Sequence, residues 1–295
     1  MSKRIISNII LLLSLFSYSL VHRLYLVQNI PSMANFIATS FLILLTSLTI
    51  LLLGFKKDKI NPLKKKVNIT VIIFLVLYFA ISYLIGLEGG YVANSNSLNL
   101  ISILGNIFIP TIIIICTEIF RYIVINANKD RKFILSLSTI LIIFFELCFT
   151  NDLKIFMNKE TLVMALTLNI IPIISKNLAL SYLTYETGLK PTLFYRLIME
   201  LSIFVVPMVP VLGNYLTSII GVTLPVCIFI KASQIVDKYY GREEIEKKKK
   251  TGFIDVIIVG MLAIVFFVAC KTLPSRAPTP GNFSNSIISV FNIGE

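Results

Sequence analysis

The sequence predicts an all-α polytopic membrane protein with about nine transmembrane helices, the N-terminus inside and the C-terminus outside. Three observations lead to this fold class. The 295-residue chain is 56% hydrophobic and 14% charged, with a mean hydropathy of +0.87, whereas soluble domains carry about 25% charged residues. Apolar runs of about 20 residues, the length that crosses a bilayer as a helix, recur along the whole chain. Short basic clusters separate them, as expected of cytoplasmic loops.

Nine apolar runs define the expected helices. The first follows two basic residues, as in a signal peptide, but it lacks an evident cleavage site and is expected to remain uncleaved. The seventh and eighth are separated by a turn around Leu212-Gly213, and Pro207 and Pro225 would allow either one to be kinked or re-entrant. The expected ranges are 5–22, 34–55, 67–87, 99–123, 132–150, 161–184, 196–211, 214–235 and 252–270.

The distribution of basic residues sets the orientation, because cytoplasmic loops carry an excess of Lys and Arg. The connection 56–66 and the segment 238–250 are rich in these residues, whereas 88–97 has none. Nine helices with this alternation place the C-terminus outside. The chain then divides into a multi-span helical domain with a basic cytoplasmic linker, residues 1–250, and a final helix with a short outer tail, residues 251–295. We expect a multi-pass protein of the cell membrane.

The composition argues against several function classes. The net charge of +12 comes largely from lysines at helix ends, so it indicates topology and not nucleic-acid binding. The four cysteines lie in apolar segments without CxxC spacing, and His22, expected at the interface, is the one histidine. Zinc sites and Ser-His or Cys-His catalysis are therefore not indicated. Phosphate-binding loops, dinucleotide fingerprints and HExxH motifs are absent from the sequence. We expect no cofactor and no metal, with membrane lipids as partners.

Charged residues inside the apolar runs are the first candidate sites, because a charge in the membrane is costly and usually faces a partner or the bundle interior. Glu118 and Arg121 are three residues apart, and Arg196 and Glu200 are four apart. Side chains at these spacings share a helix face. Both spacings predict a structural ion pair at a helix end, near the cytoplasmic boundary.

Glu146 and Lys176 are less easily explained. Glu146 lies in a long apolar run with no cation on its own helix face, so it needs a partner or a proton. Lys176 follows Pro172 by four residues, in a polar section of the sixth expected helix. A transporter could use such residues. An interhelical structural pair explains them at least as well, and no inverted repeat between the two halves favours transport.

The chain ends in Ser284-Asn285-Ser286-Ile287-Ile288-Ser289-Val290-Phe291-Asn292-Ile293-Gly294-Glu295. This segment resembles the box of type I signal peptidases, which runs Ser-x-Ser-Met-x-Pro, a short partly apolar stretch and then Gly-Asp. In that family the box follows a transmembrane helix on the outer face. The run 181–196 also resembles multi-span membrane regions that are fused upstream of some bacterial signal peptidases. The chain is thus similar to a signal peptidase with a multi-span N-terminal membrane domain.

The resemblance implies a Ser/Lys serine endopeptidase that cleaves signal peptides from exported preproteins. Ser286 matches the nucleophile, and Ser284 matches the hydroxyl that stabilises the oxyanion. The family's lysine base lies in a β-rich domain tens of residues later, and this chain has no lysine after Ser286. Ile287, Ser289 and Glu295 also depart from the family pattern. We therefore expect a truncated or degenerate protease domain, inert as the chain stands, with exported preproteins or the secretion machinery as further partners.

Two alternatives remain open at the level of the sequence. A tail rich in Ser, Asn and Pro can produce a Ser-x-Ser spacing by chance. The chain would then be a non-catalytic transporter or a membrane assembly protein.

Overall fold

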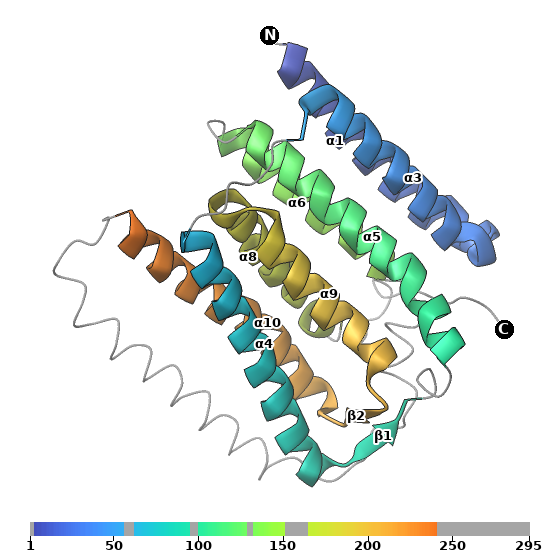
Figure 1. Cartoon of the computed structure of the whole chain (residues 1–295). Helices are drawn as coiled ribbons and strands as arrows, with labels where there is room; N and C mark the ends of the chain where they lie inside the picture. Colours follow the sequence, from blue (N-terminus) through green and yellow to red (C-terminus); the bar gives the residue numbers. More distant parts are fainter. Residues whose placement is uncertain (1–2, 56–61, 95–99, 129–131, 151–164, 241–295) are drawn as a thin grey trace.

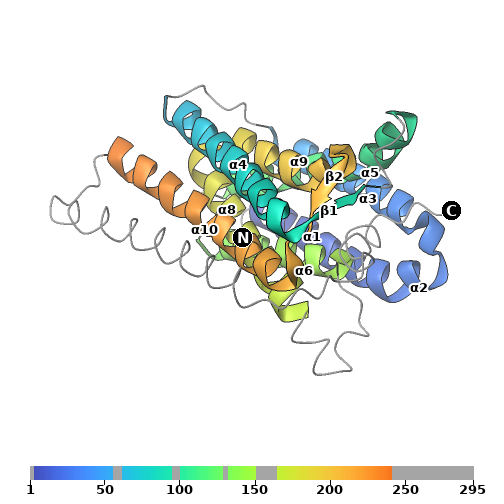
Figure 2. The same cartoon turned by 90° about the horizontal axis from the view of Figure 1, so that it is seen from below.

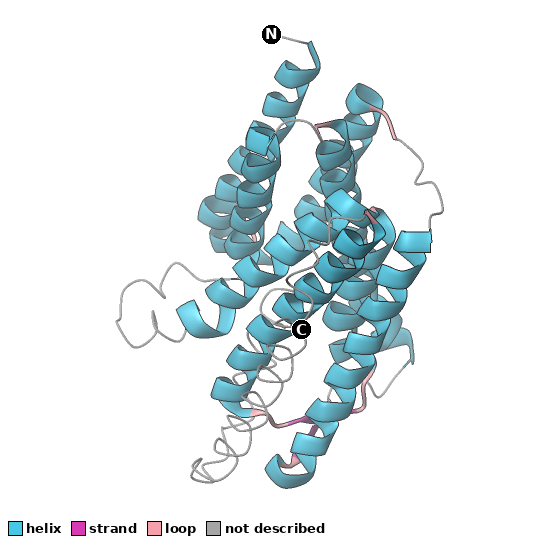
Figure 3. Cartoon of the chain, turned by 90° about the vertical axis from the view of Figure 1, so that its left-hand side faces the viewer, coloured by secondary structure: helices cyan, strands magenta, loops and turns pink. Residues whose placement is uncertain are grey.

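The computed structural model describes residues 3–55, 62–94, 100–128, 132–150 and 165–240, and helices form nearly all of this part (Figure 3). The longer helices are α1 (Lys3–Val21), α3 (Pro31–Leu53), α4 (Pro62–Gly89), α5 (Leu100–Ala127), α6 (Lys132–Thr150), α8 (Ile171–Thr187), α9 (Leu189–Val205) and α10 (Gly213–Tyr239). Two π-helical turns extend them: η1 (His22–Leu26) continues α1 into the short α2 (Val27–Asn29), and η4 (Leu166–Ile170) leads into α8.

Seven of these eight helices are long and apolar enough to cross a membrane, which indicates a multi-pass membrane protein. The helix outside this set is α9, which has 17 residues. The prediction of an all-α polytopic membrane fold is confirmed in this coarser form. The ninth expected helix, 252–270, lies outside the described residues.

The helices form two groups, each with its own hydrophobic core. We name each group after its first helix: the α1 group comprises α1, α3, α5 and α6, and the α4 group comprises α4, α8, α9 and α10. Within the groups, α3 packs on α5 and α8 packs on α10; across them, α5 packs on α9. Figure 1 shows the two groups side by side, with α5 next to α9. The boundary between the groups, which we call the seam, therefore runs between α5–α6 and α8–α9.

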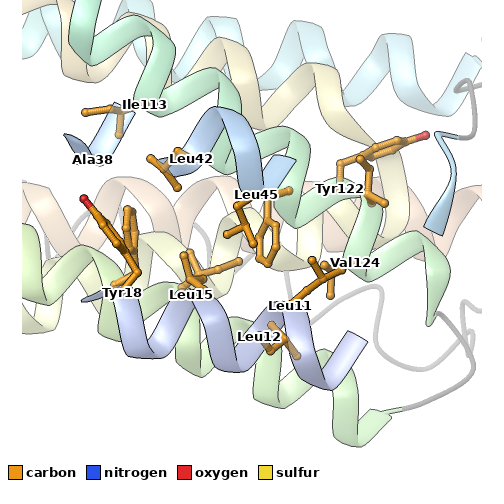
Figure 4. Packing of buried hydrophobic residues seen from close by; sticks show 14 of the residues in the cluster. Leu11, Leu12, Leu15, Tyr18, Ala38, Leu42, Leu45, Ile113, Tyr122 and Val124 are labelled. Carbon is orange, nitrogen blue, oxygen red and sulfur yellow. The ribbon is translucent and has the colours of Figure 1, made fainter. Parts of the chain in front are cut away.

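The core of the α1 group is built from apolar residues at helical spacing. Leu11 and Leu15 share one face of α1, and Ala38, Leu42 and Leu45 share one face of α3. Figure 4 shows these side chains meeting those of α5. Ala38 is fully buried, and its small side chain lets neighbouring helices approach closely, as small residues do in membrane bundles.

A two-stranded antiparallel sheet interrupts the helical pattern at one end of the bundle. Strand β1 (Tyr91–Ala93) follows α4, and β2 (Met208–Pro210) lies between α9 and α10, with Val92 opposite Val209. Figure 2 shows both strands beside the end of α4. The side-chain amide of Asn94 donates to the carbonyl of Val206 (2.9 Å), and its backbone N–H donates to Pro207 (2.9 Å). The sheet thus ties the end of α4 to the connection between α9 and α10.

The seventh expected helix, 196–211, is wrong in its position. Helix α9 begins seven residues earlier, at Leu189, and ends at Val205. The apolar run continues to residue 211, but Pro207 and Pro210 lack the N–H groups that a helix needs, and the chain there forms β2. At the other end, Gly188 adopts a φ of +96° and caps α8, a conformation that glycine adopts without steric cost. A single residue therefore joins α8 to α9.

Candidate functional site

Charged side chains meet at the seam, where the two hydrophobic cores end. They come from four helices and form a continuous set of ion pairs, which we call the charge network. Three are carboxylates and three are cations, so the network is neutral as a whole. Its members are Glu118 and Arg121 of α5, Glu146 of α6, Lys176 of α8, and Arg196 and Glu200 of α9.

The charge network lies deep inside the bundle. Helices α5 and α8 end, and α6 and α9 begin, at the end of the bundle predicted to be cytoplasmic. With a rise of about 1.5 Å per residue, Arg196 lies roughly 10 Å and Lys176 roughly 16 Å from that end. The apolar part of a bilayer is about 30 Å thick. The network therefore lies well inside the helices, where an isolated charge in a membrane is costly.

Arg196 is the centre of the network because its guanidinium reaches a carboxylate on each of three helices. Its Nη1 donates to Glu118 (3.1 Å) and its Nη2 donates to Glu146 (2.8 Å). Its Nε and Nη2 donate to the two oxygens of Glu200, at 2.8 and 3.1 Å. The planar fork of five N–H donors makes this arrangement possible, and a lysine could not reproduce it.

Lys176 links the same carboxylates by a second route. Its Nζ donates to Glu146 at 2.7 Å and to Glu200 at 3.0 Å. The neighbouring Asn177 donates its side-chain amide to the second oxygen of Glu146. Both oxygens of Glu146 are thus bound by groups from α8, and the carboxylate that lacked a partner on its own helix obtains one from across the seam.

Arg121, at the fully buried end of the network, binds groups on both sides of the seam. It contacts Glu118 at 3.3 Å and donates to the backbone and side-chain oxygens of Asn177, at 3.2 and 2.5 Å. A longer contact reaches Ser181 (3.4 Å). Within the described residues, Oε2 of Glu118 and Nε of Arg121 are buried without a hydrogen-bond partner.

The side chains of the network that lie on α5 are fully buried, and those on α8 and α9 are more exposed. The side chains of Glu118 and Arg121 are 0% exposed and that of Arg196 is 5% exposed, whereas Lys176 is 19% and Glu200 is 23% exposed. Residues 197–203 of α9, which surround Glu200, are all partly exposed, although α9 packs against α4, α5 and α8. One edge of the network, formed by Lys176 and Glu200, is therefore accessible.

The structure brings together Glu146 and Lys176, the two intramembrane sites that the sequence singled out. It also forms the two predicted intrahelical pairs, on α5 and on α9. The prediction that the pairs lie at helix ends is wrong, because α5 continues to Ala127 and α9 begins at Leu189, which place both pairs well inside their helices. Their closeness to the cytoplasmic boundary stays a prediction. Asn177 was not expected in the site; its polarity next to Lys176 was the available signal.

Other predicted residues lie away from the network or outside the described part. His22 is buried, with its ring stacked on Phe149 at 4.0 Å, and does not lie at an exposed helix end. The reason is that the helical path continues through η1 and α2 to Asn29. Ser284 and Ser286 lie outside the described residues. In the segments that are described, no group of three or more His, Cys, Asp or Glu side chains could hold a metal ion.

Comparisons of the chain with protein-family models, with curated proteins and with solved structures give no match. The geometry of the charge network is therefore the basis on which a function can be argued.

Proposed function

We propose that this chain is a non-catalytic multi-pass membrane protein of transporter type, in which the accessible edge of the charge network is the polar site for a charged or zwitterionic solute. The observation that carries the proposal is the partial exposure of Lys176 and Glu200 well inside the helix bundle, at the seam between two helix groups. Ionisable groups at such depth commonly mark solute or proton pathways. Transporters often bind their substrates near the midplane between two helix bundles.

The contacts of the two exposed residues suit reversible binding. Lys176 and Glu200 contact each other at 3.0 Å, and each also has a more buried partner. Glu146 holds Lys176 at 2.7 Å, and Arg196 holds Glu200 at 2.8 Å. The contact between Lys176 and Glu200 can therefore open toward a solute without leaving either charge unpaired. An anionic group would meet the amine of Lys176, and a cationic group would meet the carboxylate of Glu200.

Water access to the seam tests this proposal without knowledge of the solute. With the native cysteines replaced by serine, Ile203→Cys, one turn beyond Glu200, should react with a small hydrophilic thiol reagent in membranes. Phe194→Cys is the matched control on the same helix, because its exposed apolar side chain should face lipid and should react little. Equal and negligible labelling at both positions would mean that water does not reach the seam. The network would then have only a structural role, holding the two helix groups together.

A second proposal rests on the resemblance of the tail to the signal peptidase box. If segment 284–295 is a degenerate box, the bundle serves as the membrane domain of a signal peptidase-like protein in the cell membrane, and exported preproteins or the secretion machinery are its partners. The bundle itself would not supply the lysine base: Lys176 donates its hydrogens to two carboxylates, and a protonated amine has no acceptor lone pair.

The chain is accordingly expected not to process a preprotein. The purified protein in lipid vesicles, incubated with an exported preprotein, should give no cleaved product on a gel, with an active signal peptidase as the positive control. The variant Ser286→Ala should behave identically. Cleavage that disappears in this variant would establish protease activity and contradict the non-catalytic proposal.

A further inference from the structure

The charge network divides unequally across the seam. The α5–α6 side contributes Glu118, Arg121 and Glu146, a net charge of −1, and the α8–α9 side contributes Lys176, Arg196 and Glu200, a net charge of +1. Three ion pairs cross the seam: Lys176–Glu146, Arg196–Glu118 and Arg196–Glu146, at 2.7, 3.1 and 2.8 Å. Each side is therefore the counter-charge of the other.

The two sides also differ in how readily they can enter a membrane alone. Helix α6 surrounds Glu146 with strongly apolar residues, and α5 is long and apolar. Helix α8 is the least apolar of the seven candidate spans, and α9 falls outside that set. A lone charge at the centre of a spanning helix shifts insertion about a hundredfold toward the non-inserted state. Both α6 and α8 carry a lone charge, Glu146 and Lys176, but α8 has fewer apolar residues to offset its cost. Helix α8 therefore depends more than α6 on a counter-charge from a neighbouring helix.

The connection between α8 and α9 constrains how they can insert. Gly188 alone joins the two helices, and its N–H donates to the carbonyls of Leu183 and Thr184 (both 3.2 Å). So tight a turn keeps the two helices antiparallel and adjacent. Their cations, Lys176 and Arg196, both reach Glu146.

We propose that α8 and α9 enter the membrane as one hairpin, and that Glu146 of the earlier helix α6 is the counter-charge that makes this insertion favourable. Insertion of α8 depends on Glu146 because Lys176 has its closest ion-pair partner there. This inference concerns assembly of the bundle and does not depend on the proposed transport function.

The experiment follows the placement of the α8–α9 turn in the full-length chain. Lys190→Cys, an exposed position in the first turn of α9, is introduced into a background in which the native cysteines are replaced by serine. A membrane-impermeant maleimide applied to each side of the membrane reports where the turn lies. With Glu146 present, labelling should come from one side. With Glu146→Gln, the fraction of chains labelled from the wrong side should rise severalfold, whereas Glu88→Gln, at an exposed carboxylate near the end of α4, should change nothing.

A suppressor variant distinguishes a role of Glu146 in helix insertion from a role in the stability of the folded bundle alone. Lys176→Met removes the charge that requires Glu146, so the double variant Glu146→Gln/Lys176→Met should return the turn to one side. Loss of two stabilising contacts would instead make the double variant at least as defective as Glu146→Gln alone. That result, or normal placement of the turn in Glu146→Gln, would overturn the inference.

Discussion

Arg196→Met is expected to destabilise the bundle by about 3–5 kcal/mol, the range observed when one partner of a buried ion pair is removed. Methionine fills part of the space but donates no hydrogen bond. Glu118 would keep only the 3.3 Å contact to Arg121, and its second oxygen already has no hydrogen-bond partner among the described residues. The loss should appear as a lower free energy of unfolding in denaturant, followed by fluorescence or circular dichroism in lipid or detergent.

Two further variants test whether the loss of stability comes from the shape of the guanidinium and its contacts, and not from its charge alone. Arg196→Lys keeps the charge but cannot reach carboxylates on three helices at once, so it should lie between the wild type and the methionine variant. Lys190→Met removes a cation from an exposed position on the same helix and should change stability by less than about 0.5 kcal/mol. Similar losses in Arg196→Met and Lys190→Met would show that net charge, and not the network, governs stability.

Much of the fold could be predicted from the sequence because lipid imposes one rule on the whole chain. Apolar runs of the right length must form helices, since backbone groups have no other hydrogen-bond partners in the membrane. This rule located most of the described helices to within a few residues. It failed at 196–211, where apolar residues such as Val206 and Val209 suit an extended strand as well as a helix. The hydrogen bonds from Asn94, more than 100 residues away in sequence, help to hold that segment extended.

The site could be predicted only in part, for a related reason. Spacing along one helix is visible in the sequence, so both intrahelical pairs were expected. Contacts between helices depend on packing, and nothing in the spacing of Glu146 and Arg196 indicates that they are 2.8 Å apart. The cost of an unpaired charge in the membrane did show that Glu146 required a partner. The same argument could not show that three carboxylates bind the same cations and so form one network.

The second large effect is expected at Gly89, the last residue of α4. A Cβ atom there would lie 2.5 Å from the backbone carbonyl oxygen of Val211, too close for any real contact. Because that oxygen belongs to the backbone, the clash cannot be relieved by rotation of a side chain. Gly89→Ala should therefore force the segment after β2 away from α4 and cost about 1–3 kcal/mol, as overpacking generally does.

The displacement should be local to the sheet end of the bundle. Val211 donates its N–H to the carbonyl of Gly90 at 3.0 Å, and the N–H of Asn94 donates to Pro207 at 2.9 Å. Hydrogen exchange at these two amides should accelerate in Gly89→Ala, while amides in the middle of α5 keep their protection. The matched control is Gly105→Ala in α5, where a Cβ meets nothing within 4 Å; a helical alanine there should be neutral or stabilising by up to about 1 kcal/mol.

Comparison of the two glycines tests whether the contact between α4 and the segment after β2 stabilises the strand pair. If Gly89→Ala and Gly105→Ala have the same effect, the contact between α4 and the segment after β2 does not constrain the bundle. If Gly89→Ala alone accelerates exchange, that contact stabilises the pairing of β1 with β2. The strand pair then links α4 to the chain that follows α9, the helix that carries Arg196 and Glu200 of the charge network.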